Sequence, residues 1–419
     1  MKRNYYIVGL IFLIFFVISF ITNILNSILP NIKDSFQLSL AMAGFLPFSF
    51  FIAYGVMSVP AGIIIEKYGA KAAITVSFTI ALVGAALFSL FPSFGIALSS
   101  LFLIGIGMAM LQVAINPLLR VSGGEQHFAV FSVMAQLLFG GASAISPLVY
   151  SGLMESFGAD ENAKGSIIVF MENLIPDNLE WVSLYWVFSV ILLLMIVVVS
   201  LSRFPKVELQ DDEKSGATAT YFDLLKNRYV ILFFIAIFAY VGTEQGVGNW
   251  ISQFLKEYHG LNPEVEGARA VSRFWLFLTI GCALGLVLLK LIDSRKVLIF
   301  FSGAAIISLL VAITASAEVA QIAFPLIGFF ASVMWSVIFS LALNSVSRHH
   351  GSFSGILCTG IVGGAVVPLI IGAIGQAVSL KVGMLFLLLT LGYIFSIGFW
   401  AKPLVVNHTV KLRDLFKRN

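Results

Sequence analysis

Long apolar blocks separated by short polar segments dominate the pattern of residues along the chain. Twelve of these blocks are long enough to cross a bilayer, whose hydrocarbon core of about 30 Å needs roughly 20 residues of helix. Their approximate ranges are 6–30, 41–65, 72–91, 95–118, 128–154, 182–202, 230–255, 270–289, 297–315, 319–343, 352–379 and 382–401. The pattern predicts an all-α polytopic membrane protein with twelve transmembrane helices.

The composition agrees with this prediction. Of 419 residues, 59% are hydrophobic and 11% are charged, and the mean hydropathy is +1.00. A soluble fold cannot bury that much apolar surface. The first apolar block follows MKRNYY without a small-residue cleavage site, so we expect a retained span and not a signal peptide.

Basic residues are distributed unevenly between the two sides of such a bundle. With the N-terminus placed in the cytoplasm, nineteen of the 25 Lys and Arg residues fall on the cytoplasmic side. The six on the other side are Lys33, Lys164, Lys256, Arg269, Arg273 and Lys381. Because positively charged loops stay in the cytoplasm, both termini are predicted to be cytoplasmic. This location of the charges explains the basic pI without nucleic-acid binding.

One polar segment divides the chain into two parts. Residues 204–228 include VELQDDEKSGATAT, which is too polar to insert into a bilayer. The pattern therefore predicts a six-helix half over 1–203, a cytoplasmic linker over 204–228, and a second six-helix half over 229–419 with a short tail. A weak repeat supports two halves, because GIIIEKYGAK follows the second block and KLIDSRK follows the eighth. Paired halves with a site at their interface are typical of alternating-access transporters.

The loop after the second block carries a motif. Its residues match GxxxDRxGRK, with Glu in place of Asp and Ala70 in place of a basic residue. The matching residues are Gly62, Glu66, Lys67, Gly69 and Lys71. With this motif and the layout of six plus six spans, the chain resembles the major facilitator superfamily. The resemblance implies a gating role for Glu66, Lys67, Gly69 and Lys71, in a short turn whose charges stabilise one closed state.

Longer segments carry a narrower resemblance. PAGIIIEKYGAKAAI, AMLQVAINPLLRVSGGEQHFAVFSVMAQLLFGGAS, FAYVGTEQGVGNWI and IFSLALN are similar to the fucose/galactose/glucose:cation symporter family. This resemblance implies sugar uptake driven by a proton or sodium gradient, in a bacterial inner membrane. Proton-coupled members have an Asp late in span one and a Glu before the Asn-Pro of span four. Asn26 and Gln112 stand there in this chain, and neutral amides cannot carry a proton.

One acidic residue, Glu244, lies in the middle of an apolar block, within YVGTEQGVGNW. A charge at mid-depth costs about 2.5–3.5 kcal/mol, so such a residue indicates a functional site by default. Glycines at 242, 246 and 248 predict a weakened helix around it. We expect Glu244 to couple a cation, either Na⁺ held by oxygen ligands or a proton. The alternative is a structural acid that is hydrogen-bonded within the bundle.

Amide and aromatic residues inside the blocks are candidates for binding a sugar. An amide both donates and accepts hydrogen bonds, as a sugar hydroxyl does, and an aromatic face covers the apolar side of a pyranose. The candidates are Asn23, Asn26, Gln112, Asn116, Gln136, Gln245, Asn249, Trp250 and Trp335. The alternatives are interhelical hydrogen bonds for the amides, a helix kink at Pro117 for Asn116, and a membrane-interface anchor for Trp250.

The remaining reactive residues have ordinary interpretations. Cys282 and Cys358 lie in apolar blocks without pairing or metal-ligand spacing, and His349 and His350 lie in a predicted loop. Arg273 is predicted to extend its charged end to the interface. The sequence contains no P-loop, catalytic triad or zinc motif, so we expect neither an enzyme nor a cofactor.

These observations predict secondary uptake of a neutral monosaccharide in symport with Na⁺ or H⁺, by a monomer in a lipid bilayer. Three alternatives stay open. They are a drug or lipid exporter of the same superfamily, a uniporter that does not need an ionisable Glu244, and a sugar receptor that does not transport.

Overall fold

The computed structural model describes residues 4–123, 128–160, 164–176, 178–205, 218–346 and 350–402. Twelve helical segments within these ranges are long and apolar enough to cross a membrane. They are Tyr5–Ser35, Leu40–Ile65, Ala70–Leu90, Phe94–Gly123, Met134–Phe157, Glu180–Leu201, Arg228–His259, Pro263–Leu291, Ser294–Thr314, Ala317–Leu343, Ser352–Ala377 and Leu380–Trp400. The predicted twelve-span, all-α architecture is confirmed.

Several spans consist of more than one helix. The first part of the chain contains α1 (Tyr5–Asn23), α2 (Leu25–Ser35), α3 (Leu40–Tyr68), α4 (Ala70–Leu90), α5 (Phe94–Gly123), α6 (Phe128–Phe157), α7 (Ser166–Glu172), η3 (Glu180–Val182), α8 (Ser183–Leu201) and α9 (Thr218–Leu225). The second part contains α10 (Arg228–His259), η4 (Pro263–Gly267), α11 (Ala268–Leu291), α12 (Ser294–Thr314), α13 (Ala317–Ala331), α14 (Met334–Leu343), α15 (His350–Thr359), η5 (Gly360–Val362), α16 (Gly363–Ala377), α17 (Leu380–Leu385) and α18 (Leu387–Trp400).

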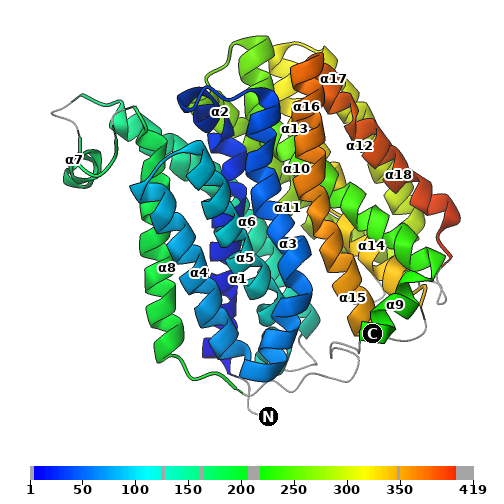
Figure 1. The fold of residues 1–419 in the computed structure, drawn as a ribbon. Helices are drawn as coiled ribbons and strands as arrows, with labels where there is room; N and C mark the ends of the chain where they lie inside the picture. The colour runs from blue at the N-terminus through cyan, green and yellow to red at the C-terminus, as the bar shows by residue number, and fades with distance from the viewer. Residues whose placement is uncertain are drawn as a thin grey trace, which may run out of the picture.

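Buried apolar side chains form two cores. One core is built almost entirely from α1–α8 and the other almost entirely from α9–α18. Figure 1 shows α1–α8 and α10–α18 as two groups of helices side by side. Helices α2, α3 and α6 pack across the boundary against α10, α16 and α11. We call the end of the bundle where α1 begins and α18 ends the terminal end, and the opposite end the far end.

Helix α10 runs without interruption through the stretch around Glu244. It begins after Asn227, whose side chain accepts a hydrogen bond from the Tyr229 N–H at 2.9 Å, and ends at Gly260, which has φ +65°. The expectation of a weakened helix at this stretch is wrong. The glycines serve close packing instead, because a Cβ on Gly246 would lie 2.8 Å from Leu387 Cδ2 and one on Gly242 would collide with Val367.

The irregular backbone lies in the first span. Helices α1 and α2 are separated at Ile24, and the Ser27 N–H bonds to the Ile24 carbonyl at 2.9 Å, three residues back instead of four. This break places Asn23 and Asn26 on either side of a local change in helix geometry. Irregular backbone at membrane depth is tolerated where it is buried in protein, and both asparagines are 1% exposed.

Candidate functional site

The Glu244 carboxylate is held by two side chains of its own helix. Tyr240 Oη donates a hydrogen bond to Glu244 Oε2 at 2.5 Å, and Gln245 Nε2 donates one to Oε1 at 3.3 Å. The Cys282 thiol of α11 lies within electrostatic reach of the carboxylate. The Trp335 ring of α14 lies 5.9 Å from that of Tyr240. The acid therefore lies between α10, α11 and α14, with both oxygens engaged and the side chain partly exposed.

Gln245 connects this acid to the first half of the chain. Its Oε1 accepts a hydrogen bond from Asn249 Nδ2 at 3.4 Å and lies 3.5 Å from the Asn26 carboxamide, which also reaches the Asn249 backbone N–H. Gln245 is 3% exposed, and Asn26 and Asn249 are 1% exposed. A row of polar side chains thus runs from Glu244 through Gln245 to Asn26, across the boundary between the two cores.

Close approach of the two helices at this point depends on Gly248. A Cβ at position 248 would collide with Asn26 Nδ2, so a larger residue there would displace the Asn26 carboxamide. At this point of contact between α2 and α10, the Asn26 amide packs directly against Gly248.

Asn23 points into the first half. Its Nδ2 donates to Ser143 Oγ on α6 at 2.8 Å and to Ser19 Oγ at 3.4 Å. Asn23 Oδ1, Ser27 Oγ and Asn249 Oδ1 are buried and have no hydrogen-bond partner within the part of the chain that the structure describes. Buried polar atoms are nearly always paired, so these three atoms are candidates for contact with a polar ligand in a conformation that exposes them.

Three other predicted site residues are more accessible than the buried Asn23, Asn26, Gln245 and Asn249. Gln112 on α5 and Trp335 on α14 are partly exposed, and Gln136 on α6 is exposed. By their positions along their helices, these three lie between mid-depth and the terminal end. The predicted residues therefore form two groups, one accessible toward the terminal end and one buried toward the far end. The Asn116 side chain lies outside what the structure describes.

Trp250 lies in the core of the second half. Its ring is 0% exposed, and its Nε1 donates a hydrogen bond to the Pro368 carbonyl of α16 at 3.1 Å. Because the ring is buried inside the bundle, Trp250 is not a membrane-interface anchor, and it offers no open face to a sugar in this conformation.

The motif residues lie at the turn between α3 and α4. Gly69 has φ +83° and ψ 160°, a conformation that is essentially restricted to glycine. Lys71 Nζ donates to the carbonyls of Ser200 and Ser202 at 2.8 and 2.9 Å, at the end of α8. Lys67 Nζ lies 5.2 Å from the centre of the Tyr68 ring. These contacts join elements of the first half, and the Glu66 side chain is not described.

A second set of contacts between the halves lies toward the far end, and sequence reasoning missed it. Asn31 Nδ2 of α2 donates to Glu264 Oε1 of η4 at 2.6 Å, and Asp34 of α2 pairs with Lys256 of α10. The Leu40 N–H of α3 donates to Gln376 Oε1 of α16 at 3.2 Å. These contacts hold the two halves together at the far end.

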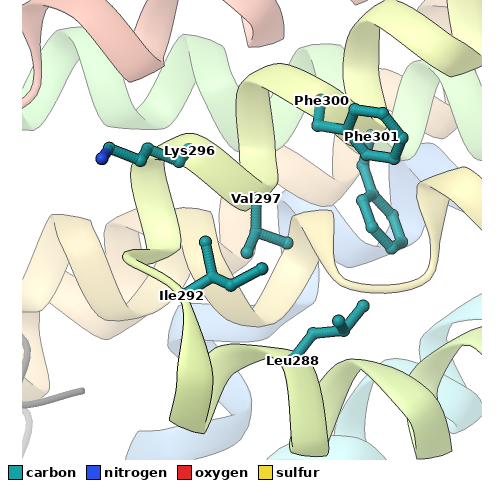
Figure 2. Close-up of a pocket in the computed structure, with 6 residues that line it drawn as sticks. All are labelled: Leu288, Ile292, Lys296, Val297, Phe300 and Phe301. Atoms are coloured by element: carbon teal, nitrogen blue, oxygen red, sulfur yellow. The ribbon is translucent and has the colours of Figure 1, made fainter. Parts of the chain in front are cut away.

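An apolar pocket of about 300 Å³ lies between α11 and α12 (Figure 2). Its lining residues are Leu288, Ile292, Lys296, Val297, Phe300 and Phe301. The walls of the pocket are almost entirely hydrocarbon. Because a sugar needs hydrogen-bonding partners, this pocket does not fit a sugar. Within the described ranges, no group of three or more His, Cys, Asp or Glu side chains is arranged to hold a metal ion.

A helical membrane protein with twelve spans, two cores and a polar row across their boundary has the architecture of an alternating-access transporter. Residues 11–368 match the Major Facilitator Superfamily, and the chain belongs to this family. It is therefore a member of a transporter family and not an enzyme.

Within this superfamily, the chain is similar to transporters of sugars. The chain is 30% identical over 409 residues to a glucose/galactose transporter of Brucella abortus, covering 95% of this chain and 94% of that protein. It is 25% identical over 396 residues to the L-fucose-proton symporter of Escherichia coli, covering 90% and 88%. The predicted resemblance to the sugar–cation symporters is confirmed.

Solved structures share the fold. FucP in its outward conformation has a TM-score of 0.68 at 23% identity, covering 94% of this chain and 98% of that one. A bacterial homologue of the lysosomal transporter Spinster, in an inward-facing unoccupied conformation, has a TM-score of 0.78 at 15% identity, covering 94% and 96%.

Proposed function

We propose that this protein imports a neutral monosaccharide in symport with a proton, by alternating access between its two six-helix halves. The observation that carries the proposal is the position of Glu244. This acid lies near the middle of α10 and is hydrogen-bonded to the amide row that reaches the other half. Relatives named as glucose/galactose transporters and fucose-proton symporters support sugar as the substrate class.

The surroundings of Glu244 favour a proton over Na⁺. Hard cations need several oxygen ligands around them. Among the described residues, the groups that hydrogen-bond to the carboxylate are the Tyr240 hydroxyl and the Gln245 amide nitrogen, of which one is an oxygen. A proton needs only the carboxylate itself, so Glu244 suits proton coupling although Asn26 and Gln112 replace the acids of related carriers.

The sugar would bind beside this acid. We expect Gln112, Gln136 and Trp335, which lie toward the terminal end, to offer amides and an aromatic ring to the sugar, and the buried Asn26 and Asn249 to limit the site on its inner side. We expect Asn249 Oδ1 and Ser27 Oγ, which have no hydrogen-bond partner among the described residues, to accept from sugar hydroxyls.

The proposed orientation in the membrane rests on the distribution of the Lys and Arg residues. We place the terminal end and both termini in the cytoplasm of a bacterial inner membrane, because nineteen of the 25 basic residues then lie inside. One charge crossing about 150 mV supplies roughly 3.5 kcal/mol, which corresponds to a gradient of a few hundredfold in a neutral sugar. We expect the monomer to be sufficient.

The test is uptake into proteoliposomes that contain the purified protein. Labelled D-glucose, D-galactose and L-fucose are each offered with a pH gradient, with a Na⁺ gradient, and with neither. Accumulation that follows the pH gradient supports the proposal. Accumulation that follows Na⁺ alone would assign a sodium symporter, equilibration without accumulation a uniporter, and binding without uptake a receptor. Failure to bind any sugar would favour the exporter.

A further inference from the structure

The apolar pocket between α11 and α12 continues into a second one. The second pocket, of about 290 Å³, shares Leu288, Phe300 and Phe301 with the first and extends along α11 to Leu284. We call the two joined pockets the α11–α12 groove. Leu284 and Phe300 are 50% and 67% exposed, so the groove opens to the outside of the bundle, where membrane lipids lie.

The packing of α13 explains why the groove exists. Only Ile292 and Asp293 connect α11 to α12, but these two helices contact each other at few points, and α13 packs closely against both. Gly281 of α11 permits the close packing on one side, because a Cβ there would lie 2.6 Å from the Phe329 carbonyl oxygen of α13. The space between α11 and α12 near their connection is therefore left unfilled by the protein.

The depth of the groove matches one leaflet of a bilayer. Leu284 lies seven residues before the end of α11, and Phe301 lies seven residues after the start of α12. At 1.5 Å per residue, the groove thus extends about 10 Å inward from the terminal end. One leaflet contributes about 15 Å of hydrocarbon, half of the bilayer core. An acyl chain of the leaflet at the terminal end would therefore lie along the groove.

Two lysines lie at the end of the groove where a lipid headgroup would be. Lys296 lines the first pocket, and Figure 2 shows its amine directed away from the apolar side chains. Lys290 lies in the last turn of α11. Among the described residues, neither lysine forms an ion pair or a hydrogen bond. Asp293, in the turn between the two helices, pairs with Arg295 at 3.3 Å, so it does not neutralise the lysines.

We propose that the α11–α12 groove binds an anionic phospholipid, with one acyl chain lying in the groove and the phosphate close to Lys296 and Lys290. The charge of the lysines complements an anionic headgroup, whereas a wholly apolar ligand would leave both lysines unpaired. In the orientation proposed above, this lipid belongs to the cytoplasmic leaflet. The site lies outside the sugar-binding residues, so the inference does not depend on the substrate.

The bound lipid would join two helices that otherwise contact each other little. Helix α11 packs against α6 of the first half and carries Cys282 near Glu244. A lipid in the groove would hold α11 against α12 from the opposite side. Because a ligand that binds only the folded protein stabilises it, an anionic phospholipid should also raise the melting temperature.

The test compares two phospholipids that differ only in their headgroup. Phosphatidylglycerol and phosphatidylcholine, each with palmitoyl and oleoyl chains, are titrated against the purified protein in detergent, and bound lipid is counted by native mass spectrometry. Lys296→Gln removes a charge at the mouth of the groove, and Phe300→Ala removes an apolar wall. Both side chains are exposed, so neither change is expected to prevent folding.

The controls are matched changes on α8, in the other half. Arg203→Gln removes an exposed charge just beyond the end of α8, at the same end of the bundle. Leu194→Ala shortens an apolar side chain that is 59% exposed and lies seven residues before the end of α8. Neither residue borders the groove.

We expect the wild type to bind phosphatidylglycerol at least about fivefold more tightly than phosphatidylcholine, and to melt at a higher temperature with it. Lys296→Gln should lose about fivefold in affinity for phosphatidylglycerol alone. Phe300→Ala should weaken the binding of both lipids by a similar factor. The two α8 variants should resemble the wild type.

Four results would overturn the lipid site. Equal affinity of the wild type for the two lipids would mean ordinary contact with surrounding lipid. Wild-type affinities in Lys296→Gln or in Phe300→Ala would show that the headgroup or the chain lies elsewhere. An equal loss in the α8 variants would show a general effect of surface charge or apolar area. None of these results bears on sugar transport, so the proposed function is tested separately.

Discussion

Asp34, at the end of α2, forms an ion pair with Lys256, in the last turn of α10, and so joins the two halves of the chain at the far end of the bundle. The nearby hydrogen bond from Asn31 to Glu264 joins the same two parts. The Asp34 and Lys256 side chains are 46% and 36% exposed, and exposed pairs contribute only about 0.2–1 kcal/mol each. This ion pair therefore adds little to the closure of the far end, so it does not prevent opening.

Removal of these contacts should shift the protein toward a far-end-open state. For Asp34→Asn combined with Glu264→Gln, we expect about 1–2 kcal/mol less stabilisation, roughly a tenfold change in the equilibrium. Spin labels placed at the far end of each half, with Cys282 and Cys358 replaced, would report longer distances. The control is Asp223→Asn, which breaks an exposed pair with Lys226 beside α9. Equal distances in all proteins would mean that the far end is closed by packing alone.

Glu244→Gln should separate sugar exchange from sugar accumulation. The amide keeps the shape and can still accept from Tyr240 Oη, but it has no titratable charge. We expect exchange of labelled sugar at near wild-type rates and an accumulation ratio near one under a pH gradient.

Glu257→Gln is the matched control, because Glu257 is exposed on the same helix and contacts Gln253. It should accumulate sugar normally. Accumulation at the wild-type level in Glu244→Gln would make its carboxylate structural, and coupling would then reside elsewhere.

Gly248→Ala should destabilise the protein and impair transport together. The added methyl group collides with Asn26 Nδ2, and overpacking of this kind costs about 1–3 kcal/mol. Thermal unfolding in detergent measures the effect. Gly392→Ala in α18 is the control, since nothing lies within 4 Å of its added Cβ, and it should be neutral or stabilise by up to about 1 kcal/mol. Equal melting temperatures would show that α2 can move away from α10 at no cost.

Gln136→Ala should weaken sugar binding without lowering stability. Gln136 is exposed on α6 toward the terminal end, so its loss leaves no buried partner unpaired. We expect a loss of about 1 kcal/mol in affinity, roughly fivefold, if the amide contacts a sugar hydroxyl. Isothermal titration with each sugar of the panel measures it. Unchanged affinity would place Gln136 in the access path and not in the site.

The sequence predicted the spans well because each span is a local property. Length and hydropathy within one segment decide whether it crosses a bilayer, and the central position of Glu244 in α10 follows from counting residues. The contact between Gln245 and Asn26 joins residues 219 positions apart, and it depends on which faces of α2 and α10 pack together. No pattern within either segment carries that information.

The glycines of α10 show how one pattern has two physical meanings. Glycine weakens an isolated helix, which led to the expectation of an irregular backbone. In a bundle, the same residues let Val367, Leu387 and Asn26 approach the helix closely, and α10 remains one continuous helix. Trp250 was ambiguous for a similar reason, because its depth was predictable but its contact with Pro368 was not.

The lengths of the helices determine which contacts lie outside the hydrocarbon core and are exposed to the aqueous phase. Helices α4 and α12 have 21 residues, about 31 Å at 1.5 Å per residue, which matches the hydrocarbon core. Helix α10 has 32 residues, about 48 Å, so its last turn with Lys256 projects beyond the lipid tails. Dissolved ions screen charges over about 8 Å at physiological ionic strength, so they weaken the ion pair of Lys256 with Asp34. They do not reach the buried amides near Glu244. The balance between open and closed states should therefore shift with the salt concentration at the far end, while the chemistry of coupling does not.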